Sequence, residues 1–302
     1  MRLRTFFSLQ PQKSVPHWSL WPLFSMAPLA HTLALLAMAV ATVAIEVVPL
    51  DMAWNSFDDQ YLECSENLPE ILVELHASDF CKNDEFVRNW AKAMAQWQKR
   101  RSISYPLTED QAIALMAYTM KDMKLSKQFN DAVREAGSSS WEYWNKFHFK
   151  SLHFLLTRAL QKLRRPNDCK DLFLGVNRVQ YKVEKDDEVR FGQFMLGSQS
   201  EKVAKRFGKD TMFKVHTCHG VNIQRFSMYP EEVEMLIPPF ETFKVTGVSK
   251  EGNTMRVELH STGNSSNYNC EWLKGGSLPR NFPHLRGLLL ATVAMAVVTG
   301  ML

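Results

Sequence analysis

Two glutamates placed two positions apart are the residues of this sequence best suited to chemistry. They are Glu232 and Glu234, in the segment YPEEVEMLIPPFE, which runs from Tyr229 to Glu241. The apolar residues that follow predict a strand, and side chains at positions i and i+2 leave the same face of a strand. Two carboxylates held side by side repel each other unless a cation lies next to them. The pair therefore indicates either a solvated strand edge or a site that receives positive charge.

The elements that must position this pair change type along the chain. From 56 to about 163, apolar residues recur at helical spacing in DEFVRNWAKAMAQWQKRR, EDQAIALMAYTM and FHFKSLHFLLTRALQKLRR. After Pro166, short runs rich in Val, Phe and Thr are broken by Gly, Asn and Pro, which predicts strands. Helices first and strands afterwards predict an α+β fold. We expect the aromatic stripes of the helices, together with His148 and His153, to belong to the core.

Several common signatures of catalytic and nucleotide sites are missing from the sequence. The segment GQFMLGSQS lacks the lysine of a phosphate-binding loop, and no GxGxxG motif follows a predicted strand. There is no GxSxG elbow, and no group of His, Cys and Asp residues has the spacing of a metal site. The sequence therefore predicts no metal, and it predicts that any nucleotide is bound by another fold.

Both ends of the chain are apolar, whereas its middle is not. Residues 1–44 hold a basic start, an apolar run and small residues at its end, which predicts a secretory leader with Met1 or Met26 as the start of translation. Near the other end, small residues, a polar spacer and the apolar tail of 277–302 predict a glycolipid-anchor signal; a simple tail anchor is the alternative. The mature chain is then 45–276, a length that suits one domain.

Charge and cysteine content agree with a secreted chain. The whole sequence has a net charge of +4, but removal of both ends leaves 31 of its 36 Lys and Arg residues against 32 Asp and Glu residues. This balance gives no argument for nucleic-acid binding. The five cysteines, in an oxidising compartment, predict two disulfides and one unpaired thiol. Asn264-Ser265-Ser266 is a glycosylation sequon.

Six segments, taken together and in order, resemble the arginine-specific ecto-mono-ADP-ribosyltransferases of vertebrates, which are GPI-anchored or secreted and use NAD(P). The segments are SFDDQYLEC (56–64), FHFKSLHFLLTRAL (147–160), VRFGQF (189–194), FKVHTCHG (213–220), EEVEMLIPPFETFKV (231–245) and STGNSSNYNC (261–270). The resemblance covers nearly the whole mature chain. It implies the ADP-ribosyltransferase fold, in which a helical part (56–165) packs on a β-rich part (169–272) whose two small sheets enclose an NAD cleft.

The resemblance also implies roles for the two glutamates. Glu234 would hydrogen-bond the nicotinamide ribose and stabilise the cationic sugar, while Glu232 would hold and activate the guanidinium of a target arginine. The implied activity is transfer of ADP-ribose from the co-substrate NAD to arginine side chains of extracellular or membrane proteins. Both the sugar and the arginine bring positive charge, so the repulsion between adjacent carboxylates would fall as the reaction proceeds.

Further residues receive roles from the same resemblance. The implied cofactor-binding residues are Gly175, Phe194, Ser198 and Phe207, the last as a ring that stacks on nicotinamide. The loop IQRFSMYP would recognise the target protein through Phe226 and Tyr229.

The implied disulfides join Cys64 with Cys270 and Cys169 with Cys218. Cys81 is left over, either as a buried free thiol or as a partner in an intermolecular bond.

The sequence departs from the family signature at two positions. Leu174 stands where the family has an arginine before Gly175, and Leu196 stands where it has the first serine of a Phe-x-Ser-x-Ser motif. Leucine cannot pair with a pyrophosphate or donate a hydrogen bond; Arg178 and Arg190 are the nearby cations that could compensate. One hypothesis is therefore an active transferase, with NAD hydrolysis by water as a variant. The other is a lipid-anchored surface protein that keeps the fold without turnover.

Overall fold

The computed structural model describes residues 44–64, 68–100, 103–121, 124–232 and 234–274. The chain divides into two compact units, Met1–Ala44 and Ile45–Leu302, and the second holds all that follows. Apart from Ala44, the leader predicted over 1–44 and the anchor signal predicted over 277–302 lie outside the described residues. Within the described ranges, no helix combines the length and the apolar character needed to span a bilayer.

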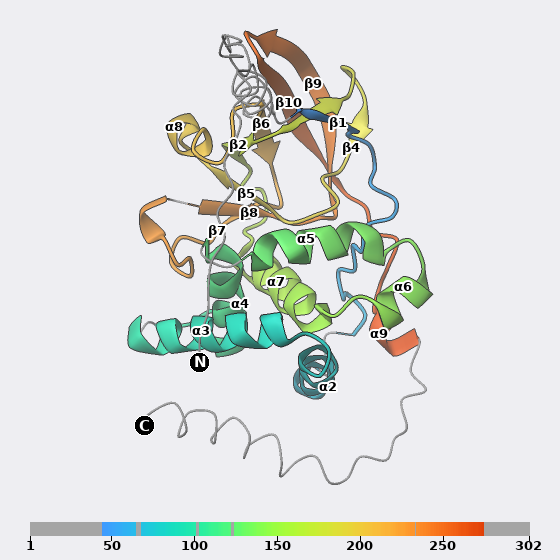
Figure 1. The fold of residues 1–302 in the computed structure, drawn as a ribbon, viewed down its shortest axis with the longest axis vertical. Coiled ribbons are helices and arrows are strands. Elements are labelled where there is room, and N and C mark those ends of the chain that lie inside the picture. Colours follow the sequence, from blue (N-terminus) through green and yellow to red (C-terminus); the bar gives the residue numbers. More distant parts are fainter. Residues whose placement is uncertain (1–43, 65–67, 101–102, 122–123, 233, 275–302) are drawn as a thin grey trace, which may run out of the picture. The chain divides into compact units, whose positions relative to one another are not determined.

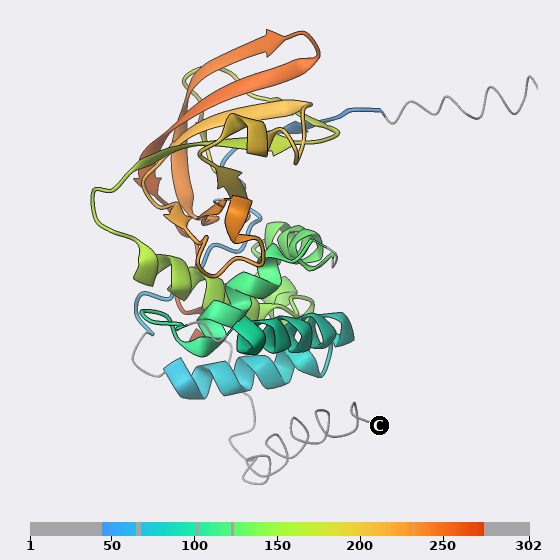
Figure 2. The ribbon, with the colours of Figure 1, turned by 90° about the vertical axis from the view of Figure 1, so that its left-hand side faces the viewer.

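Helices form the first part of the second unit, and they lie together below the strands in Figures 1 and 2. They are α2 (Leu68–Phe80), α3 (Asp84–Arg100), α4 (Glu109–Thr119), α5 (Leu125–Ala136), α6 (Ser140–Asn145) and α7 (Lys150–Leu163). The aromatic stripe predicted on α3 is confirmed as core, since Phe86, Trp90 and Trp97 are buried. His153 is also a core residue: its Nδ1 lies 2.8 Å from the Tyr61 hydroxyl, and burial lowers its pKa to about 3.

Helix α4 is fixed at its start by a capping box. The Thr108 hydroxyl accepts a hydrogen bond from the Gln111 backbone at 3.2 Å, and the Gln111 side chain accepts one from the Thr108 backbone at 3.0 Å. The two bonds satisfy N–H groups that the first turn of a helix leaves without partners. From Gln111 to its end the helix is buried. The C-terminal end of α4 is therefore held in place by the core, and Lys121 lies two residues beyond it.

Eight of the strands that follow α7 form one mixed sheet among the described residues, in the order β4-β9-β10-β6-β2-β5-β8-β7. Their bounds are β2 (Lys170–Val176), β4 (Glu188–Val189), β5 (Met195–Ser198), β6 (Thr211–Thr217), β7 (Val221–Asn222), β8 (Glu234–Ile237), β9 (Glu241–Glu251) and β10 (Thr254–Asn264). Two further strands, β1 (Glu46–Pro49) and β3 (Val179–Lys182), pair in parallel as a separate two-stranded sheet.

The eight-stranded sheet is nearly divided at one place. Strands β2 and β5 are joined through a single residue pair, Phe173 with Ser198. The strands β5, β8 and β7 on one side of this pair pack against the helices, since Leu236 belongs to the helical core. The alternate residues Met235 and Ile237 join a second apolar cluster with the strands of the other side. The two small sheets expected from the sequence are thus two parts of one continuous ladder.

Residues 56–64 differ from the prediction, because they form neither helix nor strand although the helical reading began at Ser56. Two buried aspartates hold this segment extended. Asp59 accepts hydrogen bonds from the backbone of Tyr61, Cys270 and Glu271, and Asp58 forms a fully buried ion pair with Arg190 at 2.6 Å. Short polar side chains that bond to backbone N–H groups compete with helix formation. The segment thus joins the start of the fold to its end.

Both implied disulfides are formed. Cys64 and Cys270 are bonded, and Cys270 lies between β10 and the short helix α9 (Glu271–Lys274). Cys169 and Cys218 are bonded at neighbouring ends of β2 and β6. Cys81 is free and exposed, so the reading of it as a buried thiol is wrong. The intermolecular bond of Cys81 stays a prediction.

Candidate active site

The two glutamates lie at the junction of a short turn and strand β8. Glu234 is the first residue of β8, whereas Glu232 ends a 3₁₀ turn, η2 (Pro230–Glu232), so the expectation that both lie on one strand is wrong for Glu232. Glu234 is 1% exposed and Glu232 is 8% exposed. This burial excludes the solvated strand edge as an explanation of the pair.

The loop that precedes the pair is anchored to the ends of two helices. Arg100, the last residue of α3, donates hydrogen bonds to the backbone carbonyls of Ser227 and Met228 at 2.7 and 3.1 Å. The hydroxyl of Thr119, the last residue of α4, accepts one from the Met228 backbone at 2.9 Å. These contacts hold the backbone at Ser227, whose hydroxyl bonds to Glu234. No motif in the sequence pointed to this serine.

Glu234 has an unequal environment at its two oxygens. The Ser227 hydroxyl donates a short hydrogen bond to Oε2, whereas Oε1 is buried without a partner. Burial, followed by the nearby Glu232, raises the pKa of Glu234 to about 7, against the lowering effect of Ser227 and Lys121. A buried acceptor without a donor is costly in the empty protein. Oε1 is therefore the carboxylate oxygen of Glu234 that still lacks a donor.

Glu232 is already paired with a cation. The Lys121 ammonium donates short hydrogen bonds to both carboxylate oxygens of Glu232. The same nitrogen lies 5.0 Å from the centre of the Phe207 ring and 4.7 Å from that of Tyr229. Lys121 carries no motif and lies over a hundred residues from the glutamates in sequence, so no signal in the sequence pointed to it. The rings of Phe207 and Tyr229 are each half-buried.

Ser198 joins the site through the backbone. It pairs with Glu234 across β5 and β8, and its hydroxyl donates to the Glu232 carbonyl at 3.3 Å. The hydroxyl also accepts a hydrogen bond from the Ser200 backbone at 3.2 Å. Cross-strand partners point to the same face of a sheet. Ser198 and Glu234 thus share the face that meets the helices.

Gly175 brings Phe207 to this site. A methyl group added at Gly175 would lie 2.2 Å from the Ala204 carbonyl oxygen and 2.5 Å from that of Gly208. The close approach holds the short helix α8 (Glu201–Ala204) and the following turn against β2. Gly175 therefore acts here by leaving room for backbone, and Phe207 reaches the site as a result.

Two aromatic residues predicted to touch ligands lie in the core. Phe194 is fully buried, with its ring among Tyr118, Phe129 and His153, and its carbonyl accepts from the Tyr118 hydroxyl at 2.8 Å. Its ring cannot reach a dinucleotide, so we assign it a packing role.

Phe226 is 2% exposed and stacks on Trp97 with ring centres 6.1 Å apart. It cannot contact a target protein, and only Tyr229 of the predicted recognition pair is accessible.

The two leucines that depart from the family signature occupy different faces. Leu196 pairs with Leu236 and lies on the face of Glu234, where it is half-buried against the helical core. Leu174 follows Phe173, the partner of Ser198, and so points to the other face; it is 1% exposed in the second apolar cluster. Arg190 is committed to Asp58, and Arg178 is exposed. Neither arginine is seen to take the place of the family arginine that Leu174 replaces.

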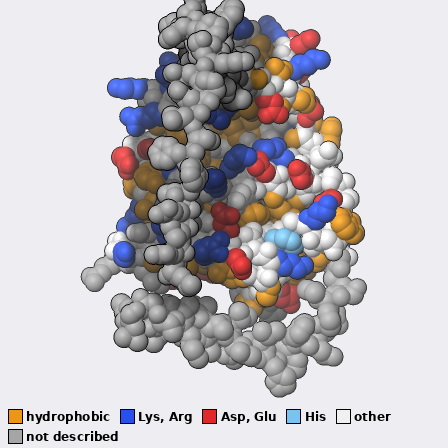
Figure 3. Space-filling view, viewed as in Figure 1, with side chains coloured by type: hydrophobic (Ala, Val, Ile, Leu, Met, Phe, Trp, Pro, Cys, Tyr) orange, Lys and Arg blue, Asp and Glu red, His pale blue; other side chains and the backbone are white. Residues whose placement is uncertain are grey.

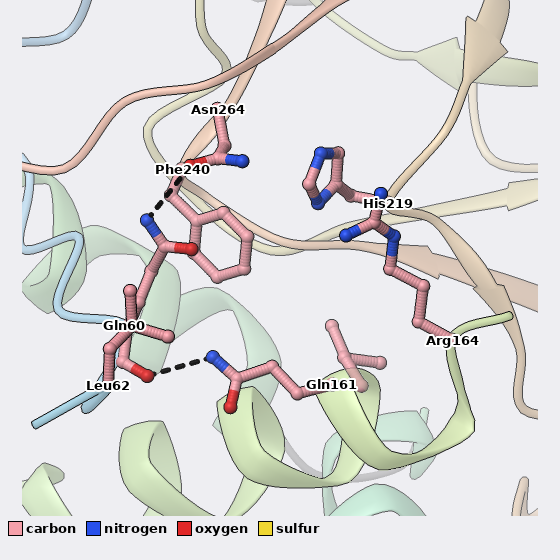
Figure 4. Close-up of a pocket in the computed structure, with 8 residues that line it drawn as sticks. Gln60, Leu62, Gln161, Arg164, His219, Phe240 and Asn264 are labelled. Atoms are coloured by element: carbon pink, nitrogen blue, oxygen red, sulfur yellow. Dashed lines mark hydrogen bonds between the residues drawn. The ribbon is translucent and has the colours of Figure 1, made fainter. Parts of the chain in front are cut away.

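Two hollows lie away from the glutamates. A cavity of about 380 Å³ is lined by Gln161 and Arg164 at the end of α7, by His219 and Phe240, and by Asn264 of the sequon, as Figure 4 shows. Asn264 is exposed, and its side-chain oxygen accepts from Gln60 at 3.3 Å. A second hollow of about 310 Å³ borders Met235, on the face of β8 opposite to Glu234.

Cations and anions are mixed on one face of the molecule. On the face drawn in Figure 3, outside the grey atoms, Lys and Arg side chains lie among Asp and Glu.

Of the described residues, one group has its potential metal-ligand atoms close together, namely Cys169, Cys218 and His216. The two sulfurs are joined in a disulfide, so they are not available as thiolates.

In this fold a helical layer packs on a split mixed sheet, and a buried Glu-x-Glu pair stands where an inner strand begins. These features define the ADP-ribosyltransferase class of fold. A crystal structure of the eucaryotic mono-ADP-ribosyltransferase ART2.2 superposes with a TM-score of 0.64 at 36% identity, covering 74% of this chain and 98% of that one. A variant of ART2.2 has been determined in complex with NADH, with the same TM-score and coverage.

Sequence comparisons give the same answer. The family described as NAD:arginine ADP-ribosyltransferase matches residues 50–267. NAD(P)(+)–arginine ADP-ribosyltransferase 2 of Gallus gallus is 42% identical over 84% of this chain and 82% of its own length. The GPI-linked NAD(P)(+)–arginine ADP-ribosyltransferase 1 of Mus musculus is 42% identical over 75% and 74%. The chain belongs to the NAD:arginine ADP-ribosyltransferase family.

Proposed function

We propose that this protein transfers ADP-ribose from NAD to arginine side chains of proteins at the cell surface. The observation that carries the proposal is the state of the two glutamates. Glu234 is buried with one free oxygen, and Glu232 holds a cation against two aromatic rings. The first arrangement suits a sugar that becomes cationic, and the second suits a guanidinium.

Glu234 is assigned to the sugar. When the bond between nicotinamide and the ribose breaks, nicotinamide keeps both electrons and leaves neutral, and positive charge develops on the ribose. Oε1 of Glu234 accepts a hydrogen bond from a ribose hydroxyl, and the carboxylate stabilises that charge. Ser227 keeps the carboxylate in place through Oε2.

Glu232 is assigned to the acceptor. Its carboxylate binds the guanidinium of the target, and one guanidinium nitrogen donates its electron pair to the anomeric carbon. A new carbon–nitrogen bond forms, and the guanidinium loses one proton, for which Glu232 is the nearest base. Ser198, Phe207 and Gly175 are assigned to the NAD side, the first by its hydroxyl, the second by stacking and the third by close packing. Tyr229 is assigned to recognition of the target protein.

The alternative without turnover draws on Leu174 and Leu196. The relatives quoted above are enzymes by name, so the comparisons lend it no support. The missing arginine and serine correspond to about 2–4 kcal/mol of NAD binding, which weakens affinity without removing either glutamate. We infer a transferase with a high KM for NAD.

The location follows from the predicted leader and anchor. Some relatives are GPI-linked by name. We propose that the mature chain is 45–276, that it carries a glycan on Asn264, and that a glycolipid holds it on the outer cell surface.

The test uses animal cells that express the full 302-residue sequence. Cells are incubated with labelled NAD and the arginine analogue agmatine, before and after treatment with a phospholipase that cleaves glycolipid anchors. We expect ADP-ribosyl-agmatine from intact cells and transfer of the activity to the medium after treatment. Glu234→Gln should lower the rate by about 10²–10³-fold or more, because it removes the charge that faces the sugar.

Two further variants complete the comparison. Glu232→Gln should lose transfer to agmatine while it keeps slow hydrolysis of NAD. Glu231→Gln, an exposed neighbour on the same turn, is the matched control and should behave as the wild type. Absence of NAD binding and turnover in the wild type would refute the transferase and favour a surface protein that acts by binding.

A further inference from the structure

Lys121 contacts Glu232 directly, and the reaction described above does not use it. Its ammonium is bonded to both oxygens of Glu232, and it lies over the rings of Phe207 and Tyr229. The three partners come from η2, from the turn after α8 and from the loop before η2. Lys121 itself follows the end of α4. Three separate parts of the chain, namely the residues after α4, the turn after α8 and the stretch 229–232, thus meet around one positive charge.

The surroundings of this charge are those that a guanidinium requires. A carboxylate offers two oxygens to a forked donor, and a planar guanidinium stacks on aromatic faces. We propose that Lys121 occupies the place of the acceptor arginine and acts as an internal competitor that sets the affinity for the target. The inference rests on the proposed function, because it takes Glu232 as the acceptor-binding residue.

The two partners of the ion pair differ in freedom. Glu232 has a side chain that is 11% exposed, and its backbone is held by the Tyr229 carbonyl at 3.1 Å and by Ser198 at 3.3 Å. The Lys121 side chain is 42% exposed, and its ammonium stands on a flexible stem of four carbons. The lysine can therefore swing out while the carboxylate stays. A paired ammonium has no lone pair, so Lys121 cannot itself attack the sugar.

A different role for Lys121 has to be separated from this one. Because Leu174 carries no charge, Lys121 could instead serve the phosphates of NAD. Its bonds to both oxygens of Glu232 favour the acceptor role, since a lysine that served phosphate would leave that carboxylate open. The two roles predict opposite effects on two ligands.

The experiment measures binding of agmatine and of NAD, separately, by calorimetry on the protein expressed from the full sequence. Lys121→Gln should bind agmatine about tenfold more tightly, with NAD affinity unchanged. Lys127→Gln, which removes an exposed lysine paired with Asp131 at 2.6 Å, is the matched control and should change neither affinity. The gain should disappear in the double variant Lys121→Gln with Glu232→Gln.

Each other outcome has a definite meaning. Unchanged or weaker agmatine binding by Lys121→Gln overturns the inference, and a loss of NAD affinity assigns Lys121 to the dinucleotide. Since agmatine binding needs no turnover, a gain in binding without transfer by any variant would refute the proposed function and leave the competitor intact. Where transfer is present, the gain should appear as a lower KM for agmatine at the same kcat.

Discussion

Glu234 has a carboxyl group that folding makes harder to ionise. Its pKa rises to about 7 because burial removes water and because Glu232 lies close by. The folded protein therefore binds a proton at this residue more tightly than the unfolded chain does, for which the ordinary value is 4.5. Between these two pH values the contribution of Glu234 to the stability falls as pH rises, since the unfolded state gives up its proton first.

This linkage yields a prediction for Glu234→Gln. At about pH 8 the variant should be more stable than the wild type by up to about 3 kcal/mol, because glutamine has no charge to bury. At about pH 4.5 the difference should be small. Thermal or urea unfolding at both pH values measures it. If the variant and the wild type had the same free energy of unfolding at about pH 8, burial of the Glu234 carboxylate would carry no cost. The control Glu231→Gln should differ from the wild type equally at both pH values.

At this scale the sequence pointed to the carboxylate pair but not to its partners. Glu232 and Glu234 stand in a short motif, whereas Ser227 and Lys121 are ordinary residues whose importance comes from contacts made by the folded chain. Phe194 and Phe226 show the opposite error. An aromatic residue next to a motif was assigned to a ligand, and its apolar ring is instead buried in the core.

At the scale of elements, strand register decides what the two leucines do. Alternation along β5 places Leu196 with Ser198 and Glu234, and it places Met195 in the second apolar cluster. The sequence shows that Leu196 replaces a serine. Only the pairing of β5 with β8 shows that the replacement faces the site.

Leu196→Ser should therefore strengthen NAD binding by about five- to tenfold, the value of one added neutral hydrogen bond. It should also cost about 1–2 kcal/mol of stability, because half-buried apolar surface is lost. Met195→Ser, on the opposite face of the same strand, should lower stability without any gain in NAD affinity. Calorimetric titration and unfolding curves of the two variants provide the comparison, and equal NAD binding by both would contradict the register argument.

The order of helices and strands was predictable, whereas their edges were not. The long periodic segments became α3, α4 and α7, and the runs rich in Val and Phe became β2, β6, β9 and β10. Strands β1, β3 and β7 are only two to four residues long, too short to show a strand pattern in the sequence. Such short pieces form because tertiary pairing holds them, not because of their own pattern.

At the scale of the whole molecule, the first and last parts of the fold are joined by hydrogen bonds and by a disulfide. Asp59 bonds to the backbone of Cys270 and Glu271, and a disulfide joins Cys64 to Cys270 across 206 residues of sequence. The helical part and the sheet lie between these ends. This closure depends on residues far apart in sequence. It was inferred from the resemblance, since spacing alone does not fix pairing.

Replacement of Cys64 and Cys270 by alanine should lower the stability by about 2–5 kcal/mol, because the unfolded chain gains freedom when so long a loop is opened. Replacement of Cys169 and Cys218, whose loop spans 49 residues, should cost less by about 1 kcal/mol in the same chain-entropy estimate. Chemical denaturation of the two double variants gives the comparison. A larger loss for the shorter loop would show that native contacts, not loop length, dominate.

The Cys64–Cys270 bond also makes the described fold a covalent ring. A protease that cuts the backbone at any single position between these two residues opens the ring but releases no fragment, since both pieces stay attached through the sulfurs. A nicked molecule would keep its mass, apart from one added water, and it would separate into two chains only after reduction. Damage that would divide an ordinary domain would here leave Glu232, Glu234 and Lys121 on one connected molecule.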